Sequence, residues 1–307
     1  MFLAPLLALG AAALYGVASV AQHRAASGIG VEEAGPLRLV GRLVRDRTWL
    51  GGKAADGGAF VLQALALAKG TLILVQAVLA CGLLFALGVS ARAAHRPLTH
   101  RERWGSLALA GGVTVLLGVG RPGGGHAGSS GVGWVAAVGL AVAAAGGSLL
   151  LARRSSPRRA AALLALATAV AFALDGALLK SAADAARDHG FGDETAVISF
   201  LSFVVAAAVG NVLIQRAFQI GALVSSLPVL TATEPIVGIA FGFALYHERL
   251  RGGPTAIAVE AAAIALMLVG SVIAASSEAR RTQVVAQPIL TEPPGGLPST
   301  PAPPPGA

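Results

Sequence analysis

Residues 219–247 read QIGALVSSLPVLTATEPIVGIAFGFALYH, and this stretch decides the class of fold. It is mostly apolar over 29 residues, and Glu234 is its one carboxylic acid. About 20 such residues are enough for a helix to cross the hydrocarbon core of a bilayer. The stretch therefore predicts a transmembrane helix. Pro228 and Pro235 each remove a helix hydrogen bond, so we expect a discontinuous helix or two short ones.

The rest of the chain has the same apolar character. Of 307 residues, 55% are apolar and 12% are charged, and the mean hydropathy is +0.73. A water-soluble surface of this size would need more polar residues. The 40 glycines indicate helices that approach each other closely in lipid. Long unbroken apolar runs exclude a β-barrel, which would alternate polar and apolar residues.

We predict an all-α, polytopic transmembrane helix bundle with about nine spans, or ten if residues 219–247 form two helices. The expected spans are 2–22, 49–67, 70–91, 104–120, 132–152, 158–180, 194–215, 219–247 and 254–275. Residues 1–276 form the transmembrane domain. Residues 277–307 are polar and rich in proline, which predicts a disordered cytoplasmic tail.

Basic residues indicate the orientation in the membrane. If the N-terminus is outside, 17 of the 23 lysines and arginines fall on the cytoplasmic side and 6 on the other. Basic segments resist translocation, so this split favours an outer N-terminus, an inner C-terminus and the cytoplasmic membrane. The net charge of +8 is then explained by anionic lipids at the basic inner loops, with no nucleic-acid partner. One such loop, 37–45, has the pattern of an interfacial amphipathic helix or of a solvated basic loop.

The two halves of the chain show weak self-similarity. Gly58-Ala-Phe-Val-Leu-Gln63 resembles Gly210-Asn-Val-Leu-Ile-Gln215, and each segment is followed by a glycine that opens the next span. Spans one to four then pair with spans six to nine, and the fifth span reverses the second unit in the membrane. We therefore predict inverted repeats at about 1–120 and 158–276, separated by an extra span at 132–152.

Several short motifs follow one another along the chain: Trp49 to Gly52, Gly57-Gly58, Gln63 to Ala68, Gly70 to Gln76, Asn211 to Ala217, Ser225 to Pro228 and Tyr246 to Leu250. Their order resembles the drug/metabolite transporter (DMT) superfamily, in the EamA-like group, with the NIPA-like magnesium transporters as the most similar branch. The resemblance implies a transporter that works by alternating access. The Pro-Leu-Gly run of the magnesium branch is replaced by Val75-Gln76-Ala77, so magnesium stays an alternative cargo.

The function expected from sequence is therefore transport of a small molecule or cation, without enzymatic activity or a cofactor. A magnesium or other divalent cation transporter is one alternative. The other is a membrane scaffold or accessory protein that transports nothing and recruits partners through its basic loops and tail. The chain has one cysteine, Cys81, so an intrachain disulfide and a four-cysteine metal site are excluded. A homodimer and a metal ligand set both stay open.

Glu234 is the sharpest candidate for a cargo-binding residue. An ionised group in the hydrocarbon costs about 2.5–3.5 kcal/mol on insertion scales, so its presence needs a reason. Binding of cargo or of a coupling proton is one reason, and a structural hydrogen bond between helices is the other. The further candidates are neutral or acidic groups in the spans: Asp175, Gln63, Gln76, Asn211, Gln215, Ser225, Ser226, Thr231 and Thr233. Because Leu83 is the residue of the first repeat that matches Glu234, we expect a site with a single negative charge.

Two other acids have structural explanations. Asp56 follows Lys53 by three residues on one helical face, which predicts an ion pair. Asp193 completes a Gly190-Phe-Gly-Asp193 run of the kind found in intramembrane aspartyl proteases. It stands in a polar loop just before a span, so an N-cap is the better interpretation.

Overall fold

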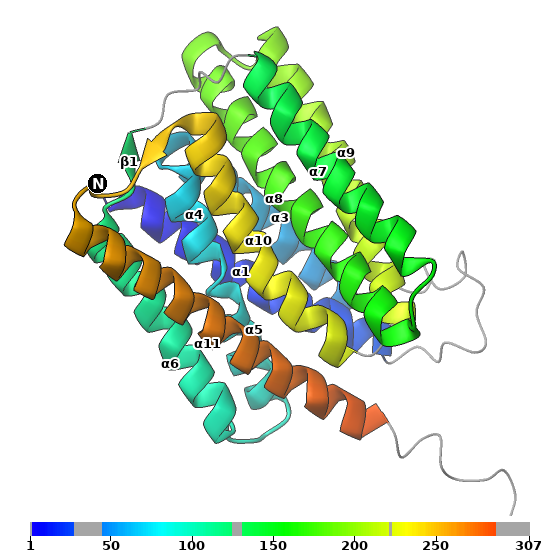
Figure 1. Cartoon of the computed structure of the whole chain (residues 1–307). Helices are drawn as coiled ribbons and strands as arrows, with labels where there is room; N and C mark the ends of the chain where they lie inside the picture. Colours follow the sequence, from blue (N-terminus) through cyan, green and yellow to red (C-terminus); the bar gives the residue numbers. More distant parts are fainter. Residues whose placement is uncertain (1, 28–44, 125–130, 221–222, 287–307) are drawn as a thin grey trace, which may run out of the picture.

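The protein is an all-α bundle, seen here in a computed structural model that describes residues 2–27, 45–124, 131–220 and 223–286 (Figure 1). Its helices are α1 (Leu3–Ser27), α3 (Arg47–Lys69), α4 (Leu72–Leu79), α5 (Gly82–Ala93), α6 (His100–Val115), η1 (Leu116–Gly120), α7 (Gly131–Ala152), α8 (Pro157–His189), α9 (Glu194–Ile220), α10 (Leu223–Tyr246) and α11 (Pro254–Ala286). Two short strands, β1 (Gly123–Gly124) and β2 (Glu248–Arg249), pair antiparallel.

Local side-chain hydrogen bonds set the starts of several helices. Asp46 accepts a hydrogen bond from the Trp49 amide at the start of α3, and Thr71 accepts one from the Leu74 amide at the start of α4. At α6, Thr99 and Glu102 form a reciprocal capping box. These groups satisfy amides that a helix cannot pair internally, so the ends of the helices are encoded locally.

The helices run between two ends of the bundle, which we name after Gly70 and Thr99. At the Gly70 end, the α3–α4 connection lies against the start of α1, because a Cβ on Gly70 would stand 2.7 Å from the Cβ of Ala4. At the Thr99 end, Arg24 of α1 donates to the carbonyl of Ala93 at 2.8 Å, and the Thr99 and Ser277 hydroxyls lie 3.3 Å apart. Successive segments therefore alternate in direction.

Glycines bring α6 and α11 into backbone contact. A Cβ on Gly105 would lie 2.8 Å from the amide nitrogen of Ala274, and one on Gly270 would lie 2.7 Å from the carbonyl oxygen of Gly105. The two helices thus cross without room for larger side chains, in agreement with the close approach expected from the composition. In Figure 1 this pair lies along one side of the bundle, and α7, α8 and α9 lie on the opposite side.

Eight segments of the described chain are long and apolar enough to cross a membrane. The outward faces of α7 and α9 carry many exposed large apolar side chains, among them Val132, Leu140, Leu151, Leu201 and Val205. Such faces suit lipid rather than water. The chain is therefore a multi-pass helical membrane protein, as predicted. The segment expected at 49–67 is also a helix, α3, but it is less apolar and is not one of the eight.

Two details differ from the sequence-based expectation. Both Pro228 and Pro235 lie inside one continuous helix, α10, whereas the interrupted helix is the third one, where α4 gives way to α5 at Ala80–Cys81. A proline removes a single amide donor, and the remaining backbone hydrogen bonds hold α10 together. Helix α11 also continues to Ala286, ten residues beyond the expected end of the transmembrane domain at 276. The loop at 37–44 and the tail from 287 lie outside the described residues.

Candidate functional site

Two carboxylic acids come together in the middle of the bundle. Asp175 lies on α8 and Glu234 on α10, two helices packed along each other, and each acid is within electrostatic range of the other. Helix α8 is the most enclosed in the molecule, because α3, α4, α7, α9 and α10 all pack against it. Asp175 and Glu234 are nevertheless both part-exposed. On such an enclosed helix, Asp175 is not completely covered by its neighbours.

Tyr15 links α1 and α3 to the region of this acid pair. Its hydroxyl donates to Oε1 of Gln63 on α3 at 2.7 Å, and Gln63 is 8% exposed. The Tyr15 hydroxyl is within electrostatic range of Asp175, Glu234 and Asp56. Polar groups from α1, α3, α8 and α10 thus converge on one region. Tyr15 is one of two tyrosines in the chain, and sequence reasoning missed it.

Gln76 closes the space on the side of the Gly70 end. Its side chain lies between α8 and α10, where a Cβ on Gly238 would stand 2.7 Å from its Cγ and a Cβ on Gly176 would meet its amide nitrogen. Gly176 is adjacent to Asp175, and Gly238 lies one turn beyond Glu234. Gln76 is 3% exposed. The two glycines therefore make the room that admits this amide next to the acids.

The other candidate residues from the sequence lie on α9 and α10. The Thr231 hydroxyl donates to the carbonyl of Leu227 at 3.0 Å, within α10 between the two prolines. Asn211 is exposed and donates to the carbonyl of Ala207 at 2.8 Å, so it does not join the acid pair. The remaining positions are as follows: Thr233 and Ser225 are part-exposed on α10, Ser226 is buried there, and Gln215 lies on α9 with a side chain outside the described part.

Helix α10 is packed differently in its two halves. From Leu227 to Glu234 every residue is part-exposed, on all sides of the helix. Beyond Pro235 buried residues return, and Leu245 and Tyr246 are almost fully enclosed. The half nearer the Thr99 end is therefore only partly covered on every side, while the half nearer the Gly70 end has one fully buried face and one exposed face.

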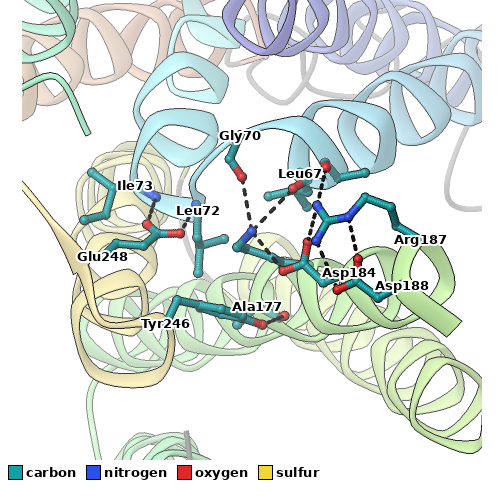
Figure 2. Close-up of polar contacts among 12 residues, drawn as sticks. Leu67, Gly70, Leu72, Ile73, Ala177, Asp184, Arg187, Asp188, Tyr246 and Glu248 are labelled. Carbon is teal, nitrogen blue, oxygen red and sulfur yellow. Dashed lines mark hydrogen bonds and ion pairs between the residues drawn. The ribbon is translucent and has the colours of Figure 1, made fainter. Parts of the chain in front are cut away.

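Glu248 binds the start of α4 at the Gly70 end. Its carboxylate accepts hydrogen bonds from the amides of Leu72 and Ile73, the second at 2.8 Å, and the residue is 2% exposed (Figure 2). The pairing of β2 with β1 holds Glu248 in this place, opposite Gly124. Burial raises the pKa of Glu248, against the opposite effects of the two amides and of Lys180. The carboxylate thus caps a helix of the first half from the second half.

Lys180 fills the neighbouring part of the same end. It forms an ion pair with Asp184 at 3.1 Å, donates to the carbonyl of Gly70 at 3.1 Å and lies over the Tyr246 ring. Arg187 donates to the carbonyl of Ala68 at 2.7 Å, and Figure 2 shows Arg187 and Glu248 on opposite sides of the α3–α4 connection around Gly70. We call Lys180, Asp184, Arg187, Tyr246 and Glu248 the Lys180 cluster. Together these side chains fasten the α3–α4 connection to α8 and α10.

A second polar network lies at the Thr99 end. Arg96 forms ion pairs with Glu102 at 2.8 Å and with Glu278 of α11 at 3.1 Å, and Glu102 is fully buried. Glu278 also accepts a hydrogen bond from Ser90 at 3.0 Å. The α5–α6 turn is thereby fastened to α11. Sequence reasoning named neither this network nor the Lys180 cluster.

The structural roles expected for Asp56 and Asp193 are both confirmed. Lys53 and Asp56 form an ion pair at 3.1 Å. Asp193 accepts a hydrogen bond from the Ala196 amide at 3.1 Å and caps α9. The expectation of a single negative charge at the site considered only the repeat-matched residues of the third and eighth spans, and the structure adds a second acid, Asp175 from α8, near Glu234.

The fold and its interior acids define a class, the polytopic helical membrane proteins with a polar centre. Among known sequences, an uncharacterized protein of Corynebacterium glutamicum is 29% identical over 252 residues, which cover 81% of this chain and 86% of that protein. The similarity thus extends over most of the helical part. No protein-family model and no solved structure matches the chain.

Proposed function

We propose that this protein is a DMT-type transporter that moves a small cation, organic or monovalent, across the cytoplasmic membrane by alternating access. The observation that carries the proposal is the pairing of Asp175 and Glu234 on adjacent central helices, within electrostatic range and part-exposed. Two acids inside a membrane domain are costly unless a cation or protons bind them. A protein that serves only as a scaffold has no need of such a pair.

The donor set favours a cation of modest charge density. Asp175 and Glu234 supply two carboxylates, and Tyr15, Gln63 and Gln76 supply neutral oxygens nearby. Such oxygens accept hydrogen bonds from an organic ammonium or coordinate a monovalent ion. Mg²⁺ retains several waters and needs near-octahedral oxygens, so magnesium is the weaker alternative.

Helix pairing supports the inverted repeats. Helix α1 packs on α3 and on α4–α5, and α8 packs in the same way on α9 and on α10. Helices α6 and α11, the last of each proposed repeat, pack on each other. The turns before them contain matching left-handed histidines, His95 with φ 48° and His247 with φ 51°. Helix α7 then is the odd span that inverts the second repeat.

Nine spans follow if α3 crosses the membrane beside α1. Its 23 residues are long enough, and it packs along α1 over its length. The distribution of basic residues then favours the Gly70 end outside and the Thr99 end in the cytoplasm. In that orientation the tight packing around Gln76 and the Lys180 cluster closes the outer end. The part-exposed segment Leu227 to Glu234 then lies on the cytoplasmic side of the acid pair, as the proposal requires for a cytoplasm-facing state.

Uptake into proteoliposomes tests the proposal. Candidate cargoes are an organic ammonium dye, Na⁺, K⁺ and Mg²⁺, each measured with and without a pH gradient. Asp175→Asn and Glu234→Gln are expected to abolish flux of the transported cation while the protein stays folded. Glu260→Gln is the matched control, because Glu260 is also a buried acid in a membrane helix and contacts a different region, near Gly120.

The outcomes separate the candidate functions. Flux of an organic or monovalent cation that depends on both acids supports the proposal. Selective Mg²⁺ flux supports the divalent alternative. No flux of any cation from folded protein supports the scaffold. Equal loss of flux in Glu260→Gln would attribute the effect to folding rather than to the acid pair.

A further inference from the structure

A groove opens on the surface where α6 and α11 cross near the Thr99 end. Its volume is about 490 Å³, and its walls come from these two helices alone. Gly105 and Ala274 bring the backbones together at its floor. Trp104 directly precedes Gly105 in sequence and Ile273 directly precedes Ala274; these two side chains form the sides of the groove and are 68% and 37% exposed. The glycine contact and its large neighbours thus form a crease open to lipid.

The lining of the groove changes in polarity along its length. Val272 and Ile273 lie toward the middle of the membrane domain, and Trp104 stands one turn inside the start of α6. His100, Arg101 and Arg280 lie at the mouth, near the ends of the helices. Apolar walls, an interfacial tryptophan and basic groups follow one another in the order of acyl chain, ester region and phosphate of a phospholipid.

The acidic side chains near the mouth already form ion pairs with another arginine, Arg96. Glu102 and Glu278 both bind Arg96, at 2.8 Å and 3.1 Å, and the Glu102 carboxylate also accepts from the Thr99 amide. Within the part of the chain that the structure describes, no ion pair or hydrogen bond joins Arg101 or Arg280 to another side chain. Both arginines are exposed. The mouth is therefore a site of uncompensated positive charge at the membrane surface.

We propose that this groove binds one anionic phospholipid of the leaflet at the Thr99 end, with its phosphate between Arg101 and Arg280 and an acyl chain along Trp104 and Ile273. The inference depends on the helices spanning a membrane and not on the transported cargo. A bound lipid here would bridge α6 and α11, the last helix of each proposed repeat. A result that contradicts the proposed transport would therefore leave the lipid site standing, and a result that contradicts the lipid site would leave the proposed transport standing.

Quenching of Trp104 fluorescence by brominated lipids tests the site. The chain has three tryptophans, so Trp49→Phe and Trp134→Phe leave Trp104 as the sole reporter. The full chain in phosphatidylcholine vesicles receives equal mole fractions of brominated phosphatidylglycerol or brominated phosphatidylcholine. We expect stronger quenching by the anionic lipid, with an affinity preference of about fivefold for each arginine near the surface.

Variants at the mouth assign the preference to this groove. Arg101→Gln with Arg280→Gln is expected to remove it, and Arg101→Lys with Arg280→Lys is expected to keep it. The matched control is Arg153→Gln with Arg154→Gln, two exposed arginines at the same end of the bundle that do not line the groove. This control is expected to leave quenching unchanged.

Three results would overturn the proposal. One is equal quenching by the two brominated lipids. Another is an equal loss of preference in the Arg153 and Arg154 control, which would indicate general surface attraction. The third is displacement of the lipid by inorganic phosphate beyond the effect of chloride at the same ionic strength, which would assign the mouth to a soluble anion.

Discussion

Replacement of Glu248 by alanine tests how the two halves of the bundle are joined. The carboxylate accepts hydrogen bonds from the amides of Leu72 and Ile73, and both are buried. A hydrogen bond to a charged group contributes about 1.5–3 kcal/mol, and the desolvation of the carboxylate offsets part of this. The alanine also leaves two amides without acceptors. We therefore expect Glu248→Ala to lower the free energy of unfolding by about 2–4 kcal/mol, in line with the loss of one partner from a buried polar pair.

The single cysteine provides the assay. Cys81 is 6% exposed at the α4–α5 junction, so a thiol-reactive fluorogenic dye labels it only when this region opens. Thermal unfolding in detergent, followed by dye fluorescence, gives the Tm of each variant. Asp188→Ala is the matched control, because Asp188 is an exposed acid at the same end, paired with Arg187, and water screens such surface pairs so that they contribute little to stability. If Glu248→Ala and Asp188→Ala unfold at the same temperature, the cap does not stabilise the bundle.

The pH dependence of the same cap has a definite sign. Burial raises the pKa of Glu248, so the folded state binds its proton more readily than the unfolded chain. The stability that this preferential protonation adds is complete below the ordinary glutamate pKa and is lost as the pH rises through the raised value. Glu248→Gln cannot titrate. The Tm of the wild type relative to Glu248→Gln is expected to rise on acidification from neutral pH, as followed by tryptophan fluorescence, and a flat difference would contradict the burial argument.

Three further predictions concern other contacts. Tyr15→Phe removes the 2.7 Å hydrogen bond to Gln63 and is expected to lower the free energy of unfolding by about 1 kcal/mol in the dye-labelling melts. If the protein transports a cation as proposed, the same variant is expected to reduce uptake into proteoliposomes by more than this small loss of stability explains. Gly270→Ala forces a Cβ into the α6 backbone and is expected to cost about 1–3 kcal/mol by overpacking, whereas Gly111→Ala, with 4.0 Å to its nearest neighbour, is expected to be neutral or stabilising in the same melts. Arg96→Gln leaves the buried Glu102 carboxylate without its partner and is expected to lower the free energy of unfolding by about 3–5 kcal/mol, seen as a lower Tm. The double variant Arg96→Gln with Glu102→Gln removes the unpaired charge and is expected to recover much of the lost Tm.

Hydropathy predicted the helical segments well because a membrane helix satisfies its backbone hydrogen bonds within itself. The information is therefore local, and each expected span has a helix in the structure. The break was assigned to the wrong helix for the same reason. Prolines are a visible local signal, yet α10 tolerates them, while the Ala80–Cys81 junction is only a tightened turn, in which the Cys81 amide donates to Val78 at 2.9 Å. No residue type marks such a turn in advance.

The candidate site was predicted in part. Glu234 and Gln76 are apparent from sequence because polar groups are rare in apolar spans. Their relation to Asp175 and Tyr15 depends on which helices pack together, and this is a property of the whole bundle. Lys180 and Asp184, four residues apart, did carry a local signal of an ion pair on one helical face. That spacing was available from the sequence and was overlooked.

The two ends of the bundle are fastened by different chemistry. In the proposed repeats, Arg96 and Glu248 follow matching left-handed histidines and lie at opposite ends. Arg96 binds two carboxylates, so its contacts are strongest when both acids are ionised. Glu248 binds backbone amides that have no titratable proton, so its own ionisation is the variable. A change of pH therefore acts on a different kind of group at each end of the bundle: on the acids that pair with Arg96 at one end, and on Glu248 itself at the other.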